Sequence, residues 1–356
     1  MSNSRFGFRH WRISSKLLVV MLALSLLPLL LAAWIINASS VEALTRQTEE
    51  GLTRLGNSMA LHISNALGNN QGLLSMAAND PAVAAAVTGG AAPGSESTLN
   101  TAVANLVQAN ERIDTVGIYD SSGTAMAHTD PSTIGRNVSA RDFIAAALQG
   151  QAFTSSFRRD LVNDQPGINL SAPVRAGDAV VGAVAIHLDE RFISDVFAQT
   201  LGAESDDMVA QAQETIDVYL VDPHGIVMSQ LRGQDWLGRS LGALSPEMEA
   251  RIAQARPLGG DCPADNPQCP PAEKIARQPA PIPSVQELGD AVSQALASGQ
   301  PGSLRYCHPD DPSAPAGDQA CGGQSFVAAF ATVAVKGLCA GGSDQDARLF
   351  TVVVDL

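Results

Sequence analysis

Two segments of the chain, about one hundred residues apart, carry the same short pattern. In each copy an Asp precedes a Gly by three residues, a Met follows, and a Gly-Arg pair closes the pattern. The first copy contains Asp120, Gly123, Met126 and Gly135-Arg136, and the second contains Asp222, Gly225, Met228 and Gly238-Arg239. Asp-x-x-Gly is typical of a turn in which Asp caps the backbone and Gly takes a positive φ. The repeat therefore predicts two related modules, each with a hairpin built on the same turn.

Short runs of β-forming residues surround the first copy of the pattern. Residues 116–119 and 124–129 flank its turn, and residues 168–174 and 179–188 form a second strand pair. Helical patterns alternate with these strands, and the second copy has similar strands separated by loops rich in Pro and Gly. The expected fold class is α+β, with an N-terminal transmembrane helix, a long stalk helix and two tandem modules built on antiparallel sheets.

Residues 17–36 carry no charge and are long enough to cross a hydrocarbon core of ~30 Å as a helix. Every acidic residue follows this run, and four basic residues precede it: Arg5, Arg9, Arg12 and Lys16. The positive-inside rule then keeps the N-terminus cytoplasmic and the remainder outside. A cleaved signal peptide, with Ala38 as the cleavage position, is the alternative, although the run exceeds a usual signal core of ~7–15 residues. We expect a protein of the bacterial inner (plasma) membrane with a single N-terminal span and a periplasmic or extracellular ectodomain.

Apolar residues recur at helical spacing after this run, from residue 38 to residue 79. Leu52, Leu55, Met59 and Ile63 follow one another at intervals of three or four, which predicts a long amphipathic helix. Asp80-Pro81 then ends this helix or starts a new one.

All five cysteines follow residue 261, in segments rich in Pro and Gly. Exported cysteines tend to form disulfides, and the close pairs Cys262/Cys269 and Cys307/Cys321 are the candidate bridges. Spacing alone leaves the pairing open. A metal site is the alternative, but no Cys-x-x-Cys occurs. We expect at least one disulfide and no metal.

The charge balance and the motifs exclude several functions. The chain has 22 basic and 36 acidic residues, whereas a nucleic-acid surface needs clustered Lys and Arg. No nucleophile elbow, zinc-protease motif, Walker loop or dinucleotide-binding glycine pattern occurs. Asp310, Asp311 and Asp318 could bind calcium, but their spacing matches no calcium-binding loop and a solvated loop is the better explanation. We therefore expect no enzyme, no cofactor and no nucleic-acid partner.

Three stretches resemble the double Cache family, the extracellular sensors of bacterial chemoreceptors, histidine kinases and cyclic-nucleotide signalling enzymes. They are residues 116–123, residues 134–143, and the strand pair 170–174 with 180–184. The order of parts is also similar, with a span, a long helix and two PAS-like modules over about residues 40–356. The resemblance implies a homodimer formed through the long helix, and these boundaries: cytoplasmic N-terminus 1–16, transmembrane helix 17–36, long helix 38–79, membrane-distal module 80–202, and membrane-proximal module with Cys/Pro-rich loops 203–356.

The resemblance also implies a ligand pocket in the membrane-distal module. The family places an Arg and an aromatic residue on the helix after the Gly-Arg turn, where Arg141 and Phe143 stand, and an Asp before a later strand, where Asp160 stands. In amino-acid-binding members the Arg helps to take the carboxylate and the Asp takes the amine, as their charges favour. Tyr119 and His128 lie on the hairpin strands, and alternation can point either one inward. These five residues form the predicted ligand-binding set.

Each of these residues also has an ordinary structural explanation. Arg141 could pair with Asp142 or Asp160 on a solvated face. Phe143 could belong to the core, His128 could lie on the surface, and Asp160 could cap a turn.

The predicted function is the extracytoplasmic ligand-sensing domain of a membrane signal-transduction receptor. The ligand would be a small polar molecule, with amino acids, organic acids and amines all open. The alternative is a membrane-anchored periplasmic hydrolase or binding protein without a signalling role. A receptor also needs an output domain, which we expect to lie outside this sequence.

Overall fold

The computed structural model describes residues 13–90, 92–159, 166–203, 216–233, 235–255, 279–282, 285–306, 326–335 and 347–355. The chain divides into two compact units, residues 1–50 and residues 51–356. Helix α1, Ile13–Ala78, begins in the first unit and ends in the second.

The predicted membrane span at residues 17–36 falls within the first part of α1. Within the described residues, no helix is found that is both long enough and apolar enough to cross a membrane. The span at residues 17–36 stays a prediction from the sequence.

The later part of α1 is the long helix that the periodicity predicts. Its apolar positions Leu52, Leu55, Met59 and Ile63 are buried. The helix ends at Ala78, and α2, Pro81–Gly89, begins at once because the Asp80 carboxylate accepts a hydrogen bond from the Ala82 amide at 2.8 Å. Asp80-Pro81 thus separates two helices, as the sequence suggests.

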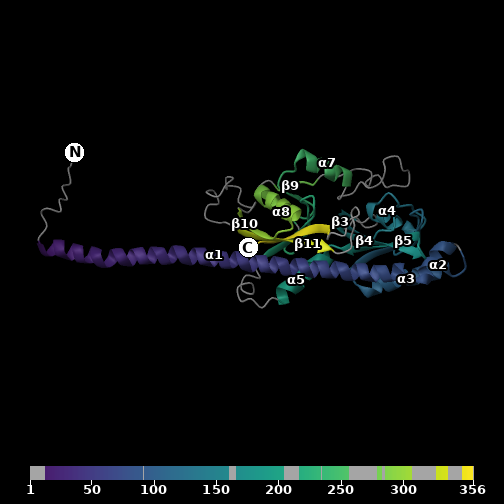
Figure 1. Cartoon of the computed structure of the whole chain (residues 1–356), viewed down its shortest axis with the longest axis horizontal. Helices are drawn as coiled ribbons and strands as arrows, with labels where there is room; N and C mark the ends of the chain where they lie inside the picture. Colours follow the sequence, from purple (N-terminus) through teal and green to yellow (C-terminus); the bar gives the residue numbers. More distant parts are fainter. Residues whose placement is uncertain are drawn as a thin grey trace. The chain divides into compact units, whose positions relative to one another are not determined.

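The first sheet contains five strands, all antiparallel to their neighbours. They are β1 (Ile113–Asp120), β2 (Ala125–His128), β3 (Phe153–Arg159), β4 (Pro166–Ala176) and β5 (Ala179–Asp189), in the order β2-β1-β5-β4-β3. Helices α2 and α3 (Ser95–Ala109) lie side by side, and α4 (Asp142–Leu148) lies near β4 and β5 (Figure 1).

The two faces of the first sheet differ in chemistry. One face carries large aliphatic residues such as Val116, Ile118, Val184 and Ile186, which belong to the same buried cluster as the apolar residues of α1, α2 and α3. The other face carries smaller or polar residues and packs against α4. Alternation along each strand produces this division, because successive side chains point to opposite faces.

The second sheet repeats the topology of the first. Its strands are β6 (Asp217–Val221), β7 (Val227–Gln230), β10 (Gly302–Tyr306), β11 (Phe326–Val335) and β12 (Ala347–Asp355), in the order β10-β11-β12-β6-β7. In each sheet the strand that comes first in the chain pairs with the strand that comes last: β1 with β5 in the first sheet, and β6 with β12 in the second. The α+β class with antiparallel sheets is therefore confirmed. We call the first sheet with α2, α3 and α4 the first module, and the second sheet with α8 (Gln286–Ser298) the second module.

Four further helices and strands lie outside the two modules. Helix α5, Arg191–Ala203, follows β5, and α7, Pro246–Ala255, follows the short strand β8, Ser240–Leu241. Strand β8 pairs in parallel with β9, Pro281–Ile282.

The repeated turns have the geometry that the sequence predicts. Gly123 and Gly225 adopt φ of 81° and 76°. Asp120 accepts hydrogen bonds from the amides of Ser122 and Thr124, and Asp222 accepts them from the equivalent amides of its own turn. Burial would raise the pKa of Asp120, but the hydrogen bonds from Ser122 and Thr124 outweigh it and hold that pKa below its usual value. Turn formation thus explains the repeated Asp without any ligand.

Several predictions fall on residues outside the described part of the chain. They concern all five cysteines, hence both candidate disulfides, and the acidic cluster at Asp310, Asp311 and Asp318. Asp160 of the predicted site belongs to the same group.

Candidate ligand-binding site

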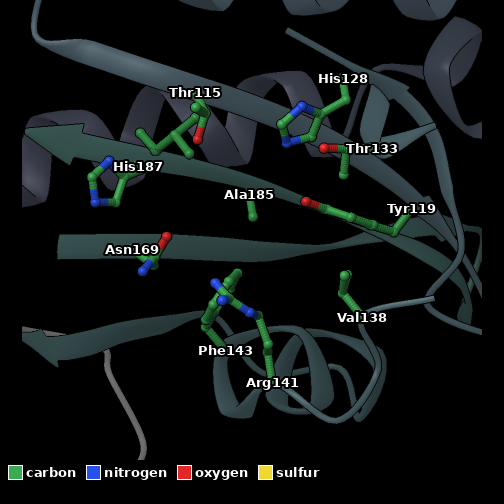
Figure 2. Close-up of a pocket in the computed structure, with 12 residues that line it drawn as sticks. Thr115, Tyr119, His128, Thr133, Val138, Arg141, Phe143, Asn169, Ala185 and His187 are labelled. Carbon is green, nitrogen blue, oxygen red and sulfur yellow. The ribbon is translucent and has the colours of Figure 1, made fainter. Parts of the chain in front are cut away.

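A cavity of about 30 Å³ lies on the α4 face of the first sheet. In Figure 2, Arg141 and Phe143 rise from one side, His128 and Thr133 lie opposite, and the Tyr119 hydroxyl points between them. All five line the cavity. The sheet therefore forms its floor, while the loop before α4 and the start of α4 form a wall.

The floor consists of rows of residues paired across three neighbouring strands. Thr115, His187 and Asn169 are register partners on β1, β5 and β4, and they form a polar row. The next row on this face, about 7 Å along the strands, is Gly117, Ala185 and Ser171. This second row has only small side chains, so the space above it stays open.

Gly117 is the residue that makes this space possible. A β-carbon built at Gly117 would collide with the hydroxyl of Tyr119. Tyr119 stands two residues further along the same face, so its ring leans back over the glycine. The absence of a side chain at Gly117 thus gives the Tyr119 hydroxyl its place in the cavity.

The second module is filled at the corresponding place. Tyr219 stands three residues before Asp222, as Gly117 stands three residues before Asp120, so the two positions are equivalent. Trp236 precedes its Leu-Gly-Arg segment as Thr133 precedes Ile-Gly-Arg. The rings of Tyr219 and Trp236 stack with centroids 4.8 Å apart and planes inclined by 14°. Two aromatic side chains therefore occupy the space that the first module leaves for a cavity.

Arg141 supplies the positive charge of the cavity. It is the N-cap residue of α4, only 7% exposed, and its guanidinium carbon lies 5.7 Å from the centroid of the Phe143 ring. The hydroxyl of Ser171 donates to the Phe143 carbonyl at 2.6 Å and ties the first turn of α4 to the floor. A guanidinium binds a carboxylate through two parallel hydrogen bonds, so an anionic ligand group is suited to this position.

His128 faces the cavity with a defined tautomer. Its Nδ1 accepts a hydrogen bond from the Asp130 amide at 2.9 Å, which leaves the proton of the neutral ring on Nε2. The hydroxyl and amide of Ser132 donate to the Asp130 carboxylate and lower the pKa of Asp130. The loop thus fixes the ring of His128 so that its Nε2–H serves as a donor.

Asn169 and His187 are buried polar residues of the floor, 3% and 1% exposed. The Asn169 Nδ2 and both ring nitrogens of His187 have no hydrogen-bond partner among the described residues. Asp114 is the acid nearest to His187, with its carboxylate 3.8 Å from Nδ1. Because a buried polar group without a partner is costly, these atoms are candidates for contact with a ligand.

The structure brings together four of the five residues of the predicted set. Tyr119, His128, Arg141 and Phe143 line one cavity. Arg141 is buried rather than on a solvated face, and Phe143 belongs both to the cavity wall and to the buried cluster under α4. Asp160 lies outside the described residues, and the binding role of all five stays a prediction.

Sequence reasoning missed the polar row of the floor. Asn169 and His187 are large polar residues inside two mainly apolar strand runs. Such an interruption on one face is a signal of a polar cavity. Which face each residue takes depends on strand register, which the sequence did not define.

The cavity offers mainly hydrogen-bond donors. These include the Arg141 guanidinium, the Nε2–H of His128 and the Asn169 amide, and no carboxylate is among its described lining residues. Across the described part of the chain, no group of three or more His, Cys, Asp or Glu side chains is arranged to hold a metal ion. The arrangement is suited to binding a small ligand with acceptor oxygens.

Comparison with known proteins connects this geometry to a family. A family model described as single Cache domain 3 matches residues 40–201. The match thus spans the later part of α1 and the first module, and the second module contributes a second sheet of the same strand order. No curated protein sequence matches the chain.

Solved structures share the fold. The sensor domain of the histidine kinase DctB from V. cholerae is 14% identical, with a TM-score of 0.55 over 88% of this chain and 98% of that chain. A structure described as methyl-accepting chemotaxis protein X is 12% identical, with a TM-score of 0.50 over 88% of this chain and 99% of that chain. At these identities the likeness shows a common fold alone. Residues 40–201 of this chain are thus similar to single Cache domain 3.

Proposed function

We propose that this chain is the ligand-sensing domain of a signal-transduction receptor and that its first module binds a small carboxylate-bearing molecule. One observation carries the proposal: the buried guanidinium of Arg141 lines a donor-rich cavity together with Tyr119, His128 and Phe143. Arg binds a carboxylate through two parallel hydrogen bonds, and a buried site strengthens them. The names of the two solved neighbours, a histidine kinase sensor domain and a chemotaxis protein, are compatible with a sensor.

The contacts of Ser171 suggest how binding is transmitted. Its hydroxyl bonds to Phe143 at the start of α4, and its carbonyl accepts from the Gln71 side chain of α1 at 3.1 Å. Helix α1 also contacts the second sheet, where the Ser64 hydroxyl donates to the Ala334 carbonyl. A ligand that draws Arg141 toward the floor would stabilise one arrangement of α4, and Ser171 would pass the change to α1.

Arg141→Ala should weaken binding of a carboxylate by about 10- to 100-fold, the scale of a charge-assisted hydrogen bond. Acetate, propionate, lactate and alanine are suitable probes, with affinity measured by calorimetry and by the ligand-dependent shift of the melting temperature. Arg136→Ala is the matched control, because Arg136 is an exposed residue of the same module outside the cavity. A carboxylate probe that binds wild type and Arg141→Ala equally well would contradict the proposal.

We also propose that the sensing domain lies outside the cytoplasm and stays attached through residues 17–36. The support is the uncharged run with Arg5, Arg9, Arg12 and Lys16 before it. Alkaline phosphatase fused after Leu356 should be active in the membrane fraction. Leu24→Arg with Leu27→Arg, the control, should abolish that activity by disrupting the span. Activity released into the soluble periplasmic fraction would instead indicate cleavage.

A further inference from the structure

The polar row of the floor has unused hydrogen-bonding capacity. Asn169 and His187 face each other in register on β4 and β5, both almost completely buried, and both line the cavity. The Asn169 Nδ2 and the His187 ring nitrogens lack partners among the described residues. A neutral imidazole has one donor and one acceptor, and the amide nitrogen adds donors. Together they complement a group that both donates and accepts, as a hydroxyl does.

The charges around this row favour a neutral group there. Arg141, which lines the cavity, carries a permanent positive charge and can bind one carboxylate. The Asp114 carboxylate, 3.8 Å from His187 Nδ1, already places a negative charge beside the row. A second carboxylate at the row would therefore find little net positive charge.

The volume of the cavity favours a short ligand. A cavity of about 30 Å³ accommodates about two to three water-sized groups. Even a two-carbon acid, with four or five non-hydrogen atoms, requires the wall at α4 to move outward, and a longer chain requires a larger movement.

Resting on the proposed function, we propose that the ligand is a short 2-hydroxycarboxylate. Its carboxylate binds Arg141, and its hydroxyl binds Asn169 and His187. In Figure 2, Asn169 is drawn between Arg141 and His187, and all three residues line the cavity. Asn169 and His187 are then the residues that determine specificity, while Arg141 supplies affinity for any carboxylate.

Four probes with one skeleton test this assignment on the full chain. The four probes differ only in the group on the carbon next to the carboxylate. This group is hydrogen in acetate, hydroxyl in glycolate, ammonium in glycine and a second carboxylate in malonate. Glycolate should bind about tenfold more tightly than acetate, the scale of one to two hydrogen bonds in a buried site. Glycine and malonate should bind no more tightly than acetate. Tightest binding by glycine or malonate would overturn the hydroxycarboxylate assignment.

Asn169→Leu should remove the preference for glycolate and leave acetate affinity within about twofold. Because this substitution removes a buried polar atom that lacks a partner, the melting temperature should be unchanged or higher. His187→Leu provides a second variant with the same expected loss of preference. Thr351→Val is the matched control, since Thr351 is buried in the second sheet and its hydroxyl also lacks a partner.

The outcomes separate this inference from the proposed function. Acetate binding that depends on Arg141, without tighter binding of glycolate, would overturn the role of Asn169 and His187 and leave the proposed function standing. Tighter binding of glycolate that persists in both Asn169→Leu and His187→Leu would have the same meaning. If none of the four probes binds, both are overturned.

Discussion

Gly117→Tyr should leave the first module without measurable ligand binding. The substitution introduces the residue that the second module has at the corresponding position, Tyr219, which is buried and fills the equivalent space. Even a β-carbon at Gly117 collides with the Tyr119 hydroxyl, so a full ring would displace Tyr119 and occupy the cavity. The protein should remain folded, with overpacking costing about 1–3 kcal/mol.

Calorimetry with carboxylate probes measures this effect, and circular dichroism verifies the fold. Gly117→Ala is the milder variant, for which we expect binding to weaken by about tenfold because only the Tyr119 hydroxyl must move. Gly72→Ala is the control, since a β-carbon on this α1 glycine meets no atom within 4 Å. It should leave binding unchanged and stabilise the helix by about 1 kcal/mol. Wild-type affinity in Gly117→Tyr would show that ligands bind elsewhere.

Trp236→Ala should lower the free energy of unfolding by about 3–5 kcal/mol, the usual cost of truncating a buried large aromatic residue. Trp236 is 5% exposed, stacks on Tyr219 and belongs to the buried cluster that α8 covers. The loss combines burial, stacking and the cavity that remains.

Denaturant titration followed by circular dichroism measures this loss. Ile134→Ala is the control, because Ile134 is also a large apolar residue but is 46% exposed. Its cost should stay within about 0.5 kcal/mol, as for other exposed positions. A loss below about 1 kcal/mol in Trp236→Ala would contradict the interpretation that these rings form the core of the second module.

The two predictions rest on one difference between modules of the same topology. Where the first module has Gly117 and Thr133, the second has Tyr219 and Trp236. In the first module the small pair leaves a cavity lined by polar groups, and in the second module the aromatic pair fills the corresponding space. The same sheet therefore serves as a binding floor in one copy and as ordinary core in the other.

Local patterns were sufficient for much of the fold. The repeated turns at Asp120 and Asp222 form as expected, because side-chain capping and a positive φ at glycine depend on only four residues. The long helix follows from apolar spacing, and its boundary from Asp80-Pro81. The resemblance of the segment around Arg141 to the Cache family directed attention to Arg141 and Phe143, which do line the cavity.

The sequence by itself determined where turns, strands and helices form, since these depend on neighbours along the chain. It also identified Arg141, Phe143, Tyr119 and His128 as candidates. Only the tertiary structure decided that Asn169 pairs with His187 and that the space above Gly117 stays open. A shift of one residue in strand register would turn Asn169 and His187 to the opposite face. Register between distant strands is decided by packing on both faces of the sheet, and no short stretch of sequence contains that information.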